Sequence, residues 1–151
     1  MPRAGGRYIQ HVSQQNVDLV LAGYRAFLAG EWDTISDLLD PDVEWHGIDE
    51  GLREGADRDG VLGVLAERLE DLPRVTLERC VGVGDRVVVY FRAAELQADP
   101  TDDRPLQTRR YYTIGRYAGV ITIRDGRVVE IQDYPHVHAA LDAVGLAGEF
   151  T

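Results

Sequence analysis

Lysine is absent from this chain of 151 residues, so all 16 basic residues are arginines. Without a lysine amine the protein cannot form a Schiff base with a carbonyl substrate, which excludes that class of covalent catalysis. The 26 acidic residues leave a formal net charge of −10. This charge repels phosphate backbones, and the arginines do not form the clustered stripe that nucleic-acid binding uses. We therefore expect no nucleic-acid partner.

Cysteine, long apolar runs and phosphate-binding loops are also scarce. Cys80 is the single cysteine, so no internal disulfide can form, which agrees with a reducing compartment. No apolar run approaches the roughly 20 residues of a membrane span, and the first ten residues lack the apolar core of a signal peptide. Gly82 and Gly84 lead into another strand rather than a helix, and His136 and His138 would diverge at a helix start. These absences predict a cytoplasmic protein that does not associate with a membrane and that uses no cofactor or metal.

The first half of the sequence has the apolar spacing of helices, with hydrophobic residues recurring at steps of three and four. Gly30 suits the end of the first helix, and Pro41 ends the second because proline disfavours helix at the preceding residue. Asp57 or Asp59 can cap the third helix, which Pro73 closes. The predicted elements are helices over 13–29, 32–39 and 61–72, a brief strand over 43–47, a polar loop over 49–59 and a flexible tail over 1–12.

The second half changes to the alternating pattern of strands, in which successive side chains point to opposite faces. Asp125-Gly126 marks a tight hairpin between the last two strands. The predicted elements are strands over 75–83, 86–96, 108–124 and 128–134 and a closing helix over 137–146. Three helices followed by an antiparallel meander predict one α+β domain over 13–151.

Three segments carry a resemblance to a known family. They are Asp42-Val43-Glu44-Trp45-His46-Gly47, the run Ile123-Arg124-Asp125-Gly126-Arg127-Val128-Val129-Glu130-Ile131-Gln132-Asp133-Tyr134, and the closing segment 139–146. In this order they resemble SnoaL-like proteins of the nuclear-transport-factor-two-like superfamily. The resemblance implies helices packed on a curved antiparallel sheet that forms a cone-shaped pocket, with a short C-terminal helix. It implies the fold more than the reaction, because the superfamily includes polyketide cyclases, ketosteroid isomerases, limonene epoxide hydrolases and non-catalytic members.

Two enzyme mechanisms of this superfamily match the chain incompletely. The resemblance to limonene epoxide hydrolases places Asp133 and Arg92 at their catalytic aspartate and arginine, but Ala94 stands at their second aspartate. Ketosteroid isomerases match less well, because their base aspartate, helix tyrosine and oxyanion aspartate fall on Trp45, on Gly23 and near Gly119. The pattern that remains is SnoaL-like, in which an acidic residue in the cone takes a proton from an activated carbon.

Asp133 is the expected base. It shares a strand face with the apolar Ile131, which predicts that its carboxylate faces the pocket. Desolvation in such a pocket makes a carboxylate a better base. The alternative is structural, a strand-end aspartate that caps the final helix or pairs with an arginine.

Arg92 is expected on the pocket side of its strand together with Tyr90 and Ala94. There its guanidinium could hold an enolate or carboxylate oxygen, although direct pairing with Asp133 would weaken the base. The alternative is a structural arginine that bridges cross-strand acids. The opposite side of the strand predicts a homodimer through the outer sheet face, formed by the apolar residues Val87, Val89, Phe91 and Ala93.

Aromatic and histidine side chains supply the other predicted ligand contacts. Trp45 is expected to face inward, as a stacking wall for a planar ligand or as simple core. Tyr24 and Tyr117 either donate hydroxyls into the cone or belong to the core. His46 contacts a ligand only if its strand bends, and His136 only if it reaches the pocket mouth; surface positions are the alternatives.

Three functions follow from these residues. The first is a cofactor-independent polyketide cyclase or isomerase on a polyketide-like or terpenoid substrate, with Asp133 as base and Arg92 as oxyanion stabiliser. The second is a non-catalytic domain that binds a small hydrophobic organic molecule, because a lone aspartate–arginine pair can be structural. The third is an epoxide hydrolase, which Ala94 disfavours because it removes one acid of that triad.

Overall fold

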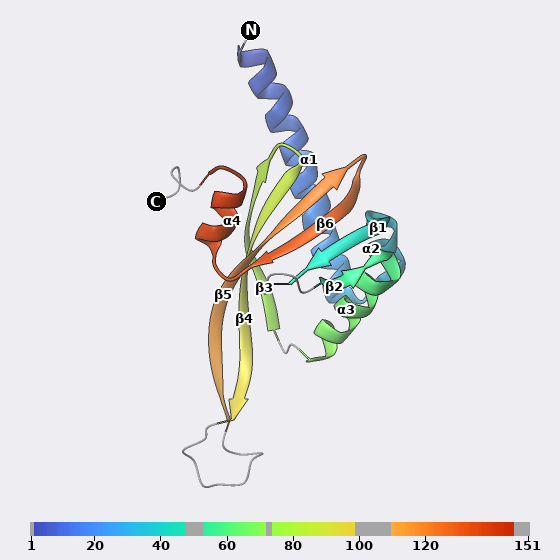
Figure 1. Ribbon diagram of the computed structural model, residues 1–151, viewed down its shortest axis with the longest axis vertical. Coiled ribbons are helices and arrows are strands. Elements are labelled where there is room, and N and C mark those ends of the chain that lie inside the picture. Colours follow the sequence, from blue (N-terminus) through green and yellow to red (C-terminus); the bar gives the residue numbers. More distant parts are fainter. Residues whose placement is uncertain (1, 48–52, 72–73, 99–109, 147–151) are drawn as a thin grey trace.

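A curved sheet packed against helices forms the frame of the protein. The computed structural model describes residues 2–47, 53–71, 74–98 and 110–146. The helices of this part are α1 (Pro2–Ala29), α2 (Trp32–Leu38), α3 (Asp57–Asp71) and α4 (Val137–Ala143). Its strands are β1 (Leu39–His46), β2 (Arg53–Ala56), β3 (Arg74–Val83), β4 (Arg86–Ala98), β5 (Arg110–Arg124) and β6 (Arg127–Tyr134). They form one six-stranded sheet in the order β2-β1-β6-β5-β4-β3 (Figure 1).

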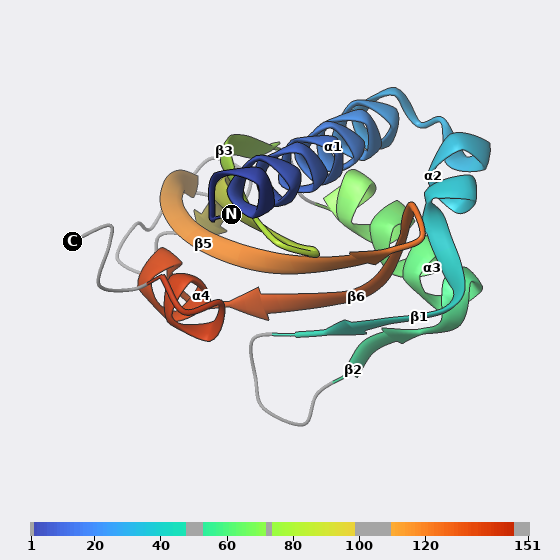
Figure 2. The ribbon, with the colours of Figure 1, turned by 90° about the horizontal axis from the view of Figure 1, so that it is seen from above.

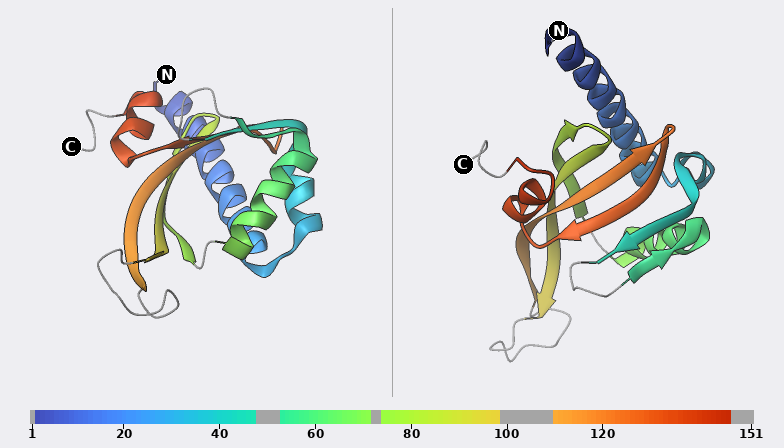
Figure 3. Two further views of the ribbon diagram at one scale, coloured as in Figure 1. Left: turned by 60° about the horizontal axis from the view of Figure 1, so that its bottom comes forward. Right: turned by 45° about the horizontal axis from the view of Figure 1, so that its top comes forward.

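The sheet curls around α1 and α3, which lie on its concave side, while α4 packs on the opposite face (Figures 2 and 3). Each face therefore has its own apolar cluster. The concave cluster is made of Val20, Ala26, Ile35, Leu39, Val43, Trp45, Val61, Val87, Val89, Ile123 and Val128. The cluster under α4 is made of Val88, Ala118, Val120, Ala140 and Leu141. This arrangement is the predicted α+β fold of helices on a curved sheet.

Turn and cap residues act as the sequence predicts. Gly30 ends α1 with a φ of 68°, a backbone conformation that glycine adopts without steric cost. Asp125 and Gly126 both have positive φ values, 53° and 75°, as a two-residue hairpin turn requires. Asp57 Oδ1 accepts a hydrogen bond of 2.9 Å from the backbone N–H of Gly60, so the first turn of α3 is capped.

Three local features differ from the prediction. The first helix begins at Pro2, before the predicted start at residue 13, because proline is tolerated in a first turn and helix propagation costs little after nucleation. The loop expected over 49–59 contains β2, which pairs with β1 despite its weak strand propensity. The sheet is mixed rather than antiparallel, since β1 runs parallel to β6. Pairing between strands that lie far apart in the sequence leaves no pattern in the local sequence of either strand.

The phase predicted for β4 is wrong. Val87 and Val89 belong to the concave cluster, whereas Val88 and Tyr90 belong to the cluster under α4. Val87, Val88 and Val89 are all fully buried, because helices cover both faces of the sheet at this point. The alternation of side chains along β4 therefore could not show which face of the strand points toward the concave side of the sheet. The homodimer face was predicted from Val87, Val89, Phe91 and Ala93. The first three face the interior and cannot form it, and the side chain of Ala93 lies outside the described residues.

Candidate functional site

A cavity of about 160 Å³ lies between the concave face of the sheet and the helices. An apolar cavity of about 150 Å³ admits a molecule the size of benzene. Among the described residues that line it, Asp133 is the only one with a carboxyl group. The others are Leu19, Val20, Gly23, Tyr24, Phe27, Ile35, Leu38, Leu39, Trp45, Leu65, Leu77, Phe91, Tyr117, Gly119, Ile121, Val128 and Ile131. This lining suits a small organic molecule that is mostly apolar.

Asp133 lies near the end of β6 and points into the cavity, as the alternation with Ile131 predicts. Its exposed fraction is only 4%. The indole N–H of Trp45 donates a hydrogen bond of 2.9 Å to Asp133 Oδ2. Trp45 reaches this position because β1 lies parallel to β6 with Trp45 opposite Ile131, two residues before the aspartate.

This hydrogen bond explains how the fold tolerates a buried carboxyl group. A polar group taken out of water costs free energy unless a partner replaces the lost hydration. A hydrogen bond to a charged acceptor contributes about 1.5–3 kcal/mol to the stability of the folded state. The alternative in which Asp133 caps the final helix is wrong, because the Nδ1 atom of His136 accepts the capping hydrogen bond from Ala139 N–H at 3.1 Å.

Two tyrosines also line the cavity, as expected for Tyr24 and Tyr117. The Tyr24 hydroxyl accepts a hydrogen bond of 3.2 Å from the backbone N–H of Leu77, which places it at the wall between α1 and β3. The Tyr117 ring stacks on Phe91, with ring centroids 5.0 Å apart and planes at 24°. Phe91 and Tyr117 are direct cross-strand neighbours, so the pair forms one aromatic side of the cavity.

Arg92 and Tyr90 do not reach this cavity, contrary to the prediction. Arg92 is exposed, and its cross-strand neighbour is Arg116, which pairs with Glu78 at 3.1 Å. Tyr90 packs in the cluster under α4, and Arg79 lies over its ring at 5.6 Å. The side chain of Ala94 lies outside the described residues. Arg92 is therefore not in position to stabilise an oxyanion beside Asp133.

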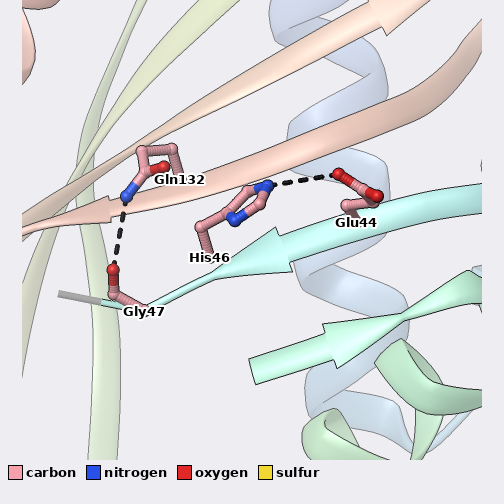
Figure 4. A network of polar contacts seen from close by, with 4 residues as sticks. All are labelled: Glu44, His46, Gly47 and Gln132. Atoms are coloured by element: carbon pink, nitrogen blue, oxygen red, sulfur yellow. Dashed lines mark hydrogen bonds and ion pairs between the residues drawn. The ribbon is translucent and has the colours of Figure 1, made fainter. Parts of the chain in front are cut away.

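The two predicted histidines lie away from the cavity lining. His46 alternates with Trp45 on β1 and lies beside Glu44, with His46 Nε2 3.3 Å from Glu44 Oε2 (Figure 4). In the same region Gln132 Nε2 donates to the carbonyl of Gly47 at 3.3 Å (Figure 4). His136 is exposed and caps α4. Within the described ranges, no group of three potential metal ligands is found. None of the described helices has both the length and the apolar character to span a bilayer.

The positions matched to ketosteroid-isomerase residues do line the cavity. Trp45, Gly23 and Gly119 are all lining residues, although none can act as a proton-transferring acid or base. Two features of the site were not predicted from the sequence: Phe91 as a wall of the cavity, and the hydrogen bond between Trp45 and Asp133, which are 88 residues apart. An indication was available for Phe91. The closing helix predicted over 137–146 must itself cover an apolar sheet face, which would have allowed the face of Phe91 to be the inner one.

Comparison with known proteins supports this fold. The profile of the SnoaL-like domain matches residues 20–131. A protein from Jannaschia sp. CCS1, provisionally named a SnoaL-like polyketide cyclase, has 22% identity and a TM-score of 0.65, with 88% of this chain and 93% of that one covered. TerC, crystallised with polyporic acid, has 22% identity and a TM-score of 0.59, covering 86% and 97%.

An epoxide hydrolase from M. tuberculosis, described as similar to limonene epoxide hydrolase, has 16% identity and a TM-score of 0.60, covering 87% and 90%. Among curated proteins, none matches the chain at a significant level. These structural likenesses show the fold alone. The match over residues 20–131 goes further, and the chain belongs to the SnoaL-like domain family.

Proposed function

We propose that this protein binds a small, largely apolar carbonyl compound of the polyketide or terpenoid type and transfers a proton on it, with Asp133 as the base. One observation carries the proposal: a carboxyl group only 4% exposed lines a cavity whose other described walls carry no carboxyl group. A carboxylate in such surroundings is a common device for abstracting a proton from carbon.

The reaction balances without a cofactor. Asp133 accepts a proton from the carbon beside the carbonyl, the electrons of the broken C–H bond form a carbon–carbon double bond, and the carbonyl oxygen takes the negative charge. The protonated aspartic acid then returns the proton to a different carbon of a conjugated enolate, which completes an isomerisation. Alternatively, the enolate carbon attacks a second carbonyl within the same molecule, which closes a ring, and the alkoxide oxygen formed there takes the proton back from Asp133. Both outcomes use the same first step.

The tyrosines of the wall are the proposed stabilisers of the enolate oxygen. Tyr24 and Tyr117 carry hydroxyl groups able to donate a hydrogen bond and both line the cavity. Arg92, which the sequence suggested for this role, is exposed and absent from the lining. The aromatic pair Phe91 and Tyr117 offers a flat surface for a ring of the ligand.

The test is the substitution Asp133→Asn, which keeps the size of the side chain and cannot accept the proton. Turnover should fall roughly 100- to 10,000-fold while ligand affinity stays nearly unchanged. We would measure turnover and thermal melting of wild type and variant side by side, on a panel of polyketide-like carbonyl compounds. A lower melting temperature with unchanged turnover would show that Asp133 is only structural.

A second candidate function is ligand binding without catalysis. It is favoured by the position of Arg92, which is exposed and is not among the residues that line the cavity with Asp133. Trp45 provides the assay, because it lines the cavity and only one other tryptophan, Trp32, is present. In a Trp32→Phe background, Trp45 fluorescence should respond to the panel; saturable binding with no turnover on any member favours this function.

Epoxide hydrolysis fits the geometry less well. The resemblance to limonene epoxide hydrolases requires an arginine near Asp133 and a second aspartate, but Arg92 is exposed and position 94 is alanine. Including epoxides in the same panel tests this reaction directly. Diol formation that depends on Asp133 would replace the proton-transfer proposal.

A further inference from the structure

Two residues, Trp45 and Gly119, lie beside the Asp133 carboxyl group. Oδ2 receives the indole N–H of Trp45 at 2.9 Å, and both side chains are buried. A hydrogen bond to one carboxylate oxygen fixes the rotation of the group about its last bond and orients the other oxygen. Trp45 is itself buried in the concave cluster, so its ring is held by packing before it makes this bond.

Oδ1 lies beside Gly119, the residue directly opposite Asp133 in the β5–β6 ladder. A Cβ atom added at Gly119 would lie 3.6 Å from Asp133 Oδ1 and 3.6 Å from Phe91 Cε2. These are ordinary van der Waals distances, so alanine would fit there without a clash. It would fill the space between the carboxyl oxygen and the aromatic wall, which the cavity now occupies.

The backbone of Asp133 is tied down as well. Gln132 Nε2 donates to the carbonyl oxygens of Gly47 at 3.3 Å and of Asp133 at 3.1 Å. Pairing between β1 and β6 ends at His46 and Gln132, so this side chain continues the link between the two strands by one residue (Figure 4). The strand that carries Trp45 and the strand that carries Asp133 are thus held together at the site.

We propose that Trp45 is a positioning residue that holds the Asp133 carboxyl group through Oδ2, and that the missing side chain at Gly119 is the specificity determinant that lets a ligand carbon approach this carboxyl group. The inference rests on the proposed function and adds to it which residue orients the base and which residue controls access to it. The Asp133 carboxylate gains the proton, the C–H electrons form the enolate, and the proton later returns to carbon from the same carboxyl group.

The assay uses phenylacetone, a neutral ketone with one aromatic ring, in deuterated water. Each cycle of proton removal and return replaces an α-hydrogen of the ketone with deuterium, which mass spectrometry counts. Wild type should exchange faster than Asp133→Asn. Trp45→Phe should lower the exchange rate roughly 10- to 100-fold through misplacement of the base, with little change in the half-saturating concentration.

A double mutant separates positioning from packing. If Trp45 acts through Asp133, adding Trp45→Phe to Asp133→Asn should slow exchange little further, because both changes remove the same oriented base. The matched control is Trp32→Phe, the same change at the tryptophan that packs on Phe27 and is not a lining residue. It should leave the exchange rate at the wild-type value.

Gly119→Ala tests access to the Asp133 carboxyl group. An added methyl group in an apolar pocket discriminates by roughly 10- to 200-fold, so the apparent second-order rate constant for exchange should fall in this range. The melting temperature should stay the same or rise, because alanine reduces the entropy of the unfolded chain. Gly115→Ala in the same strand is the control, since a Cβ there meets no atom within 4 Å.

The indole N–H supplies a readout that needs no substrate. Proton–nitrogen spectra should show two indole signals, one for each tryptophan. In Asp133→Asn the Trp45 signal should move upfield, because a neutral amide oxygen replaces a charged acceptor, while the Trp32 signal stays in place.

The outcomes are separable. Wild-type exchange no faster than that of Asp133→Asn would overturn the proposed function. Wild-type exchange above Asp133→Asn, but with Trp45→Phe at the wild-type rate or with an unmoved Trp45 indole signal, would overturn only the role of Trp45. Normal exchange in Gly119→Ala would overturn the role of Gly119.

Discussion

The hydroxyl oxygen of Tyr24 on α1 accepts a hydrogen bond from the backbone N–H of Leu77 on β3 at 3.2 Å. β3 is the last strand of the sheet in the described part of the chain, so no other described strand pairs with the backbone groups of its outer edge. The helix therefore both covers the edge of the sheet and places a hydroxyl at the cavity wall.

We expect Tyr24→Phe to lower the free energy of unfolding by about 1 kcal/mol, because the Leu77 N–H loses its acceptor in a partly buried position. Urea denaturation measures the change. Tyr90→Phe, which removes a hydroxyl on the opposite side of the sheet, is the control and should cost less. Equal losses of stability in the two variants would show that the hydrogen bond between Tyr24 and Leu77 does not stabilise the protein.

Phe91 and Arg92 test the phase of β4 directly, since they are neighbours that point to opposite faces. Phe91→Ala should lower the free energy of unfolding by about 3 kcal/mol, because it removes a large wall residue and its stacking on Tyr117. Arg92→Ala should stay within about 0.5 kcal/mol of wild type, as exposed substitutions do. Calorimetry on both variants measures the two losses of stability. A larger loss for Arg92→Ala than for Phe91→Ala would support the strand phase expected from the sequence.

His136 tests the cap of α4. His136→Ala should lower the free energy of unfolding by about 1 kcal/mol, because Ala139 N–H loses the side-chain acceptor at the helix start. His136→Asn should retain most of the stability, since asparagine is a favoured cap. Turnover should be unchanged in both variants. Lost turnover in a stable His136→Asn protein would instead place this histidine at the pocket mouth.

Cys80 provides a pH-dependent prediction. Burial raises the pKa of its thiol from 9.0 to about 11. At pH 8 the reactive thiolate should therefore be about 100-fold scarcer than in an exposed cysteine, and alkylation by iodoacetamide correspondingly slower. Because folding favours the protonated thiol, this contribution to stability is complete below pH 9 and declines as the pH rises through 11. Alkylation of the native protein as fast as that of the urea-unfolded chain would contradict the burial.

Local patterns determined most of the helices and strands of this protein, although not β2. The apolar spacing over 13–29 and 61–72 predicts α1 and α3, and the hairpin at Asp125 and Gly126 predicts the junction of β5 and β6. The inward direction of Asp133 follows from its two-residue spacing to Ile131. These features depend on side-chain period and turn chemistry, which residues close together in the chain set by themselves.

Only the tertiary structure decided what surrounds Asp133. The parallel pairing of β1 with β6 brings Trp45 to Asp133 from 88 residues away, and no local pattern encodes that contact. The face of β4 was equally undetermined, because α4 buries Val88 on one side while the core buries Val87 and Val89 on the other. When both faces of a strand are covered, alternation no longer distinguishes inside from outside, and the packing of distant helices makes the choice.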